Sequence, residues 1–333
     1  MRECADHGSI DCPLRDVASC SRDARARPSS FQGIMKPALA IVVVLYLAAV
    51  AAYAIARQQR GVWLAQLKYL LLTAGAVIMI MPFYWMLITS FKDFAEAMAY
   101  PPSWWPREIL WRNYIEAWQK PDAGFGRYYW VSISTMAMST TGVLFTSILA
   151  AYAFARMNFV GKGLFFYIVL ATLMVPAEVL LIPKYIILSS LGWLDTYKAL
   201  TVPFLASVFS IFLMRQFFMT IPGDLWDAAQ IDGAGRWRFL WLVIVPLSKP
   251  VLITTGIFNA IASWNSLLWP LVATSRAEMR TLMVGLQVFS NESSGEFQLL
   301  MAASTFCVLP IVIVFFLAQR FFIEGIARSG LKS

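Results

Sequence analysis

Three cysteines and the only histidine lie near the N-terminus, and these are the residues that could bind a metal ion. Cys4, Cys12 and Cys20 recur every eight residues, and His7 lies between the first two. Zinc sites usually take ligands from closer pairs, with about two to four residues between them. The surrounding residues are polar. We therefore expect residues 1–34 to be a disordered leader without a metal site.

A phosphate-binding loop would mark the chain as an ATPase. That loop has the pattern G-x-x-x-x-G-K followed by Ser or Thr, because its backbone amides hold the phosphates. Gly161-Lys162 lacks both the upstream glycine and the following hydroxyl. No histidine or paired carboxylates converge elsewhere, so we expect neither an enzyme nor a bound cofactor. Any ATP must be used by a separate polypeptide.

The segment Ile221–Pro250 has a pattern suited to contact with another protein. Pro222, Gly223 and Asp224 are typical of a helix start, since proline fixes a turn and a carboxylate can cap free amides. We expect a short helix over Leu225–Ile231. The segment is then a helix–turn–helix element, named the knuckle below, that is joined to the rest of the chain on both sides.

Small residues shape this knuckle. Ala228 and Ala229 leave one helix face almost without side chains, so a partner could approach it closely. Gly233 and Gly235 permit a reversal of the backbone. The following apolar run, Phe239–Val245, is far too short to cross a bilayer. An ordinary interfacial loop is the alternative reading of the same residues.

The composition indicates a membrane protein. Hydrophobic residues make up 59%, charged residues 14%, and the mean hydropathy is +0.65. Soluble domains average about 25% charged residues, so this chain must expose apolar surface to lipid. The net charge of +8 fits basic cytoplasmic loops, and we expect no binding to nucleic acid.

Seven apolar runs are long enough to span a bilayer, at about 20 residues each. They are Pro37–Ala56, Tyr69–Thr89, Tyr129–Ala151, Leu164–Ile182, Tyr197–Met214, Val251–Ala273 and Leu299–Ala318. The prediction is an all-α integral membrane protein. An extra N-terminal transmembrane helix (residues 35–60) precedes a transmembrane domain (67–333) with six core helices and a cytoplasmic loop at 221–250.

Orientation follows from Lys and Arg, which gather after the second, fourth and sixth core runs. These segments are expected in the cytoplasm. The first run, Pro37–Ala56, would then cross from outside to inside, leaving the Arg-rich residues 1–34 outside against this tendency. We therefore predict that translation begins at Met35 and that the leader is not translated.

The fifth core run carries the residues best suited to touch a sugar, which is usually held by aromatic faces and polar groups. Asn259, Trp264, Asn265 and Trp269 combine both chemistries. Asn265 and Trp269 are four apart, which would place them on one helix face. Hydrogen bonding between helices and anchoring at the interface are the alternative roles.

The knuckle resembles the EAA signature of binding-protein-dependent ABC importer permeases, which reads Glu-Ala-Ala, three residues, Gly, nine residues, Ile-x-Leu-Pro. The matching positions are Asp227, Ala228, Ala229, Gly233, Val243, Val245 and Pro246. Asp replaces Glu, and Val replaces both Ile and Leu. The resemblance implies that this loop docks the ATPase. Asp227 keeps the charge but is one methylene shorter than Glu.

Further segments resemble the carbohydrate-uptake branch, specifically the maltose-type second permease subunit. They are MPFYWMLITSFK (81–92), AYAFARMNFVGK (151–162), MVPAEVLLIP (174–183), SWNSLLWPL (263–271) and FIEGIARSGLK (322–332). This resemblance implies the type I importer permease fold in the bacterial inner membrane, with a sugar or oligosaccharide as cargo. It also implies a homologous permease, an ABC ATPase dimer and an extracytoplasmic solute-binding protein as partners.

The same resemblance implies that Thr274–Gln298 reaches the binding protein and that Phe322–Ser333 contacts the ATPase dimer. An ion-coupled secondary transporter is the alternative of a different class. It would need ionisable residues inside the membrane, and Glu178 is the sole acidic residue within the core runs, near a run end. A third possibility keeps the family but changes the cargo to glycerol phosphates or oligopeptides.

Overall fold

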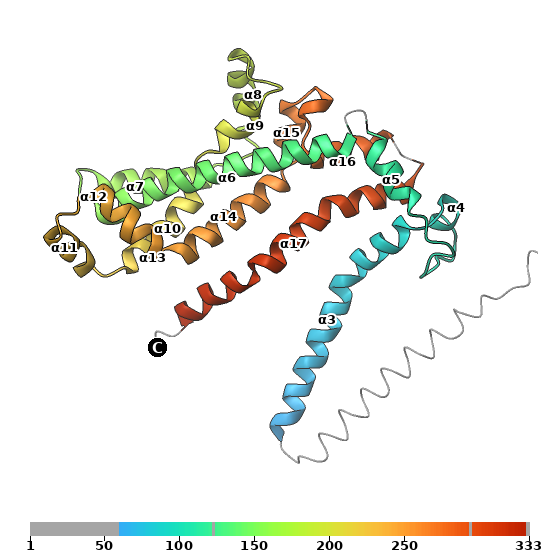
Figure 1. The fold of residues 1–333 in the computed structure, drawn as a ribbon, viewed down its shortest axis with the longest axis horizontal. Helices are drawn as coiled ribbons and strands as arrows, with labels where there is room; N and C mark the ends of the chain where they lie inside the picture. The colour runs from blue at the N-terminus through green and yellow to red at the C-terminus, as the bar shows by residue number, and fades with distance from the viewer. Residues whose placement is uncertain (1–59, 122–123, 293–294, 331–333) are drawn as a thin grey trace, which may run out of the picture. The chain divides into compact units, whose positions relative to one another are not determined.

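The computed structural model describes residues 60–121, 124–292 and 295–330, and every regular element in these ranges is a helix (Figure 1). The predicted leader, the start at Met35 and the predicted span Pro37–Ala56 lie outside the described residues. The chain divides into two compact units, Met1–Met81 and Pro82–Ser333. The described part of the first unit belongs to helix α3 (Arg60–Ser90), which contains the predicted span Tyr69–Thr89.

In the second unit, the end of α3 is held by the following short helices, α4 (Phe94–Ala97) and α5 (Arg112–Gln119). The buried amide of Asn113 donates to the carbonyls of Ser90 and Lys92 at 2.9 and 2.8 Å, which satisfies carbonyls left free at the helix end. Burial lowers the pKa of Lys92, while Glu96 opposes this effect. The Lys92 ammonium donates to the Ser103 carbonyl.

Helix α6 (Gly124–Arg156) is the centre of the second unit and packs against α10 (Val208–Thr220) and α14 (Lys249–Trp264) (Figure 1). Its buried face includes Ser139, Val143, Ser147 and Ala151, spaced four apart. Such small side chains let neighbouring helices approach closely. The predicted span Tyr129–Ala151 lies inside α6.

The predicted span Leu164–Ile182 is wrong as one helix. The chain instead forms α7 (Lys162–Ala171), a 3-10 turn (Thr172–Met174) and α8 (Leu181–Ser190). The break falls at Pro176, because proline disfavours the helical conformation of the residue before it. Val175 is accordingly extended, with φ −83° and ψ 115°.

Two further spans are bent or interrupted. The run Tyr197–Met214 consists of α9 (Tyr197–Thr201) and a 3-10 turn (Val202–Phe204), followed by α10 at an angle of 42°. The run Val251–Ala273 breaks between α14 and α15 (Leu268–Ala273). Three helices of the described chain can cross a membrane unaided, or up to five spans if each bent pair counts as one.

The C-terminal part contains a 3-10 turn (Ala277–Met279), α16 (Leu282–Glu292) and the long α17 (Phe297–Gly330). Helix α17 contains the predicted span Leu299–Ala318 and packs against α5, α14 and α16. The predicted ATPase-contacting tail is helical as far as Gly330.

Near the C-terminal end of α6, residues 221–248 fold into α11 (Asp224–Ile231), α12 (Arg236–Phe239), a π-helical turn (Leu240–Ile244) and α13 (Val245–Leu247).

Candidate coupling site

Helix α11 is the short helix expected in the knuckle, but its start differs from the prediction. Gly223 is the N-cap residue, and no side chain caps the helix. The predicted capping by Asp224 is therefore wrong. Asp224 and Asp227 lie in the first turn. Their carboxylates are favoured there by the partial positive charge of the helix N-terminus.

The end of α11 is a Schellman turn, in which a left-handed residue lets two amides reach back to the last carbonyls. The amide of Ala234 donates to the Ala229 carbonyl at 2.8 Å, and that of Gly233 to the Gln230 carbonyl at 3.0 Å. Gly233 has φ +71°, whereas Gly235 has φ −75°. Only Gly233 therefore supplies the special conformation that was predicted for both.

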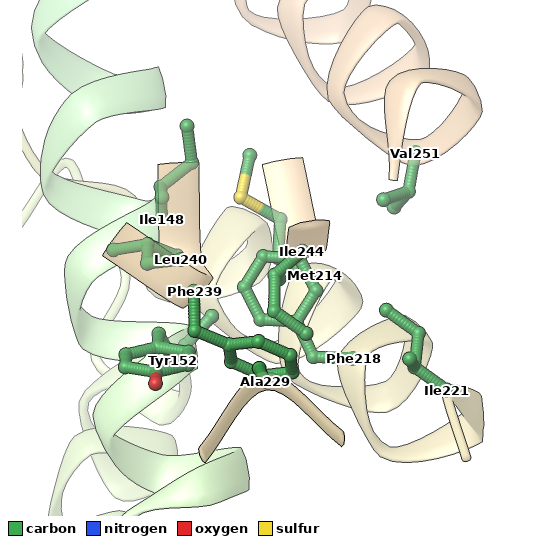
Figure 2. Packing of buried hydrophobic residues seen from close by; sticks show 11 residues of the cluster. Ile148, Tyr152, Met214, Phe218, Ile221, Ala229, Phe239, Leu240, Ile244 and Val251 are labelled. Atoms are coloured by element: carbon green, nitrogen blue, oxygen red, sulfur yellow. The ribbon is translucent and has the colours of Figure 1, made fainter. Parts of the chain in front are cut away.

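The two alanines of the motif have different surroundings. Ala229 is 9% exposed and belongs to a buried cluster with Tyr152, Phe218 and Phe239 (Figure 2). Ala228 is exposed. The prediction that both alanines form one small helix face for contact with a partner is therefore wrong, because Ala229 faces the chain's own core. Its small size lets α11 lie close against these aromatic rings.

The outward side of the knuckle combines carboxylates with exposed apolar side chains. Asp224, Asp227 and Ala228 are exposed. Ile231 is 88% and Trp237 63% exposed. Ile231 lies one turn after Asp227 on the same helix face. Sequence reasoning missed Ile231 and Trp237, although an apolar residue four positions after Asp227 was a readable signal.

A cleft of about 170 Å³ lies between α11 and the end of α6, lined by Tyr152, Arg156, Gly223, Trp226, Asp227, Arg236 and Phe239. The Arg236 guanidinium lies 5.6 Å from the centre of the Trp226 ring. Trp226 packs edge-on against Phe239 at 5.0 Å. Two cations and one carboxylate thus line a small opening beside α11.

Pro246 lies in α13, directly after the π-helical turn. Proline has no N–H to bond the preceding turn, and a local π-helical adjustment can re-satisfy the backbone groups that it leaves free. Leu240 and Ile244 of this turn are buried in the cluster around Ala229, while Val243 and Val245 pack on its edge. Pro246 is exposed. The chain then turns by 78° into α14.

Three of the four predicted path residues bond within the chain. The Asn259 amide donates to the Ser210 hydroxyl at 2.9 Å and the Thr255 carbonyl at 2.8 Å. Trp264 and Trp269 are buried, and their indoles donate to the carbonyls of Cys307 (3.1 Å) and Ala199 (2.9 Å). These contacts correspond to the helix-bonding alternative.

Asn265 is the exposed member of the set. It follows the last residue of α14, and α15 begins at Leu268, so Asn265 and Trp269 do not share a helix face as predicted. A groove of about 560 Å³ lies elsewhere, between α6 and the α9 region, with apolar walls. None of the four residues lines it, so the predicted path residues do not converge on that groove.

The described residues contain no group of three His, Cys, Asp or Glu side chains placed to hold a metal. Cys4, Cys12, Cys20 and His7 lie outside the described residues, so the expected absence of a metal site stays a prediction. Of the predicted partner-contacting loop Thr274–Gln298, the first part is bonded to the turn between α8 and α9. The Asp195 carboxylate accepts the amides of Ser275 and Arg276 at 2.6 and 2.9 Å.

Comparison with known proteins gives consistent matches. Residues 142–328 match the family model described as "Binding-protein-dependent transport system inner membrane component". The sn-glycerol-3-phosphate transport system permease protein UgpE of Yersinia enterocolitica is 34% identical, over 78% of this chain and 95% of the relative. The protein of the same name from Brucella suis is 32% identical, with the same coverage.

Among solved structures, a bacterial ABC transporter involved in the import of the acidic polysaccharide alginate shares the fold. Its TM-score is 0.70 at 24% identity, covering 79% of this chain and 98% of that one. The all-helical architecture is therefore the type I importer permease fold. The chain belongs to the family of binding-protein-dependent transport system inner membrane components, as a permease subunit of an ATP-driven importer.

Proposed function

We propose that conformational changes of the ATPase are transmitted to this permease subunit through helix α11. Asp227 and Ala228 are part of the contact surface. One observation carries the proposal. The inner side of α11 is fixed to the chain's own core through Ala229, while its outer side presents carboxylates beside the exposed Ile231. Exposed apolar groups rimmed by charges are typical of protein contact sites.

The other motif residues support this surface rather than form it. Gly233 closes α11 with the Schellman turn, and Pro246 follows the π-helical turn that leads into α14. The loop faces the cytoplasm, consistent with the Lys and Arg around it. ATP is hydrolysed by the partner, and this chain binds no cofactor. A homologous permease completes the path, and an extracytoplasmic binding protein delivers the cargo.

The cargo that we propose is a sugar or oligosaccharide, with Asn259, Trp264, Asn265 and Trp269 as path residues and Asn265 as the member exposed to contact it. An ion-coupled transporter is not favoured, because the family works with binding proteins. Glu178, the acidic residue considered for ion coupling, is exposed in the turn before α8.

A second cargo class, glycerol phosphates, is favoured by a specific observation. Lys184 of α8 places its ammonium 4.6 Å from the Phe204 ring and 4.9 Å from the Trp269 ring. Within the described chain it makes no ion pair. A cation beside aromatic faces suits an anionic, hydroxyl-rich solute. The named relatives are permeases for sn-glycerol-3-phosphate.

Co-purification from native membranes with mass spectrometry tests the assembly. We expect an ATPase, a second permease and a binding protein to accompany this chain, and recovery without any ATPase would refute the proposal. Uptake of radiolabelled sn-glycerol-3-phosphate and of neutral oligosaccharides then separates the cargo classes. Lys184→Gln should raise the half-saturating concentration for the phosphate ester alone; an equal effect on a neutral sugar would exclude phosphate recognition by Lys184.

A further inference from the structure

The last turns of α6 are bonded to the chain before and after α11, the first helix of the coupling loop (residues 221–248). Tyr152 and Arg156 are four residues apart and therefore share one face of the helix. The Arg156 guanidinium donates to the Phe218 carbonyl at 2.7 Å and also to the Ile221 carbonyl, where the chain leaves α10. The Tyr152 hydroxyl donates to the Arg236 carbonyl at 3.2 Å, where α12 begins.

These bonds lie just before and just after α11 in the chain. Helix ends leave carbonyls without partners, and the guanidinium supplies donors to those at the end of α10. Tyr152 is only 6% exposed and packs in the cluster with Ala229 and Phe239 (Figure 2). Because these bonds join α6 to the chain on both sides of α11, a displacement of that segment must carry the end of α6 with it or break the bonds.

Helix α6 can carry that displacement over its length. It has 33 residues, which corresponds to about 50 Å. The other two long helices of the described chain each contain a proline, Pro82 in α3 and Pro310 in α17, whereas α6 contains none. Since sharp helix kinks occur mostly at proline, α6 lacks the commonest cause of a kink along its length.

The opposite end of α6 is bonded to the segment that precedes α16. The Arg127 guanidinium donates to the Glu278 carbonyl at 2.8 Å, and the Ser132 hydroxyl accepts the Leu282 amide at 2.7 Å. Tyr129 bonds the Phe306 carbonyl of α17. One continuous helix thus joins the coupling loop to the start of the loop Thr274–Gln298.

We infer that Tyr152 and Arg156 are positioning residues that transmit movement of the coupling loop into α6 and, through α6, to the segment 278–282. The inference rests on the proposed docking of the ATPase to α11. Since coupling between two sites is reciprocal, the same link carries the signal of the loaded binding protein toward the ATPase.

The test uses the whole reconstituted importer with the double variant Tyr152→Phe/Arg156→Lys. These changes remove one hydroxyl and the guanidinium fork but keep volume and charge. We expect solute transported per ATP hydrolysed to fall roughly tenfold, as for the loss of charge-assisted hydrogen bonds. Stimulation of ATP hydrolysis by the loaded binding protein should fall in parallel, while the assembled complex keeps its composition.

Matched controls are Tyr185→Phe on the exposed face of α8 and Arg215→Lys, whose guanidinium bonds the Phe154 carbonyl instead of the loop. Both controls should keep the transport ratio. If the ATPase binds and hydrolyses ATP normally, yet the double variant keeps its full ratio and stimulation, the link through α6 is refuted. If the wild-type complex contains no ATPase, the proposed docking itself fails, which is a separate result.

Discussion

The coupling loop (residues 221–248) and the α14–α15 segment (residues 259–269) were both predicted as functional, but they use their side chains in opposite ways. In the loop, backbone and apolar groups bind the chain's own core, while Asp227 and Ile231 face outward. In α14–α15, the indoles of Trp264 and Trp269 bond carbonyls inside the chain. The loop leaves its carboxylates exposed, whereas the other segment uses most of its polar groups to hold helices together.

The comparison shows that the type of a residue does not by itself tell whether its polar groups are free to bind another molecule. A tryptophan whose N–H already has a carbonyl partner gains little from meeting a solute, because a new bond would replace an existing one. An exposed carboxylate at a helix start keeps its bonding capacity for another molecule. Four substitutions, two of them with a matched control, test the contrast.

The largest expected effect is in the α14–α15 segment, which holds helices together. Trp264→Ala removes a side chain that is 4% exposed, together with its bond to Cys307. We expect a loss of about 3–5 kcal/mol in the free energy of unfolding, the range for large aromatic deletions in cores. Thermal unfolding of the purified complex measures it. A variant as stable as the wild type would contradict the structural role.

Asp227→Ala tests the exposed surface of the coupling loop. Uptake should fall by about tenfold or more, as for the loss of a charged hydrogen bond, with ATP hydrolysis no longer tied to transport. Membrane insertion should be unchanged, because Asp227 is exposed and makes no ion pair in the described chain. The matched variant Asp227→Glu should keep activity. Full uptake by the alanine variant would remove Asp227 from the docking surface.

Gly233→Ala tests the geometry that closes α11. A side chain at φ +71° costs about 1–2 kcal/mol, whereas Gly235→Ala at φ −75° should change the unfolding free energy by less than about 0.5 kcal/mol. No neighbouring atom lies near either added methyl group, so the comparison isolates backbone conformation. Equal unfolding temperatures for the two variants would argue against the Schellman turn.

Asn265→Ala should have the smallest effect on stability and a selective effect on transport. Asn265 is exposed after the end of α14, so the unfolding free energy should shift by less than about 0.5 kcal/mol. We expect weaker uptake at low solute concentration, measured as a raised half-saturating concentration. Unchanged uptake kinetics would remove Asn265 from the cargo path, leaving no exposed member of the predicted set.

Local patterns predicted the local structure well. The apolar runs located α3, α6 and α17, and the small, Gly-rich segment located α11 and its turn. The breaks at Pro176 and after Trp264 were missed, since hydropathy sums over a window and does not register a change of backbone direction. The proline inside the predicted run Leu164–Ile182 was a local signal for the first of these breaks.

By itself, the sequence determined that this chain is a helical membrane protein, because composition and periodicity are properties of neighbouring residues. The motif at residues 227–246 added the resemblance to importer permeases. The tertiary structure decided which side of the Ala228–Ala229 pair is buried and which indoles are already bonded. It also revealed that Tyr152 and Arg156 hold a loop more than 60 residues away in the chain. Such partners come from distant segments, and packing alone selects them.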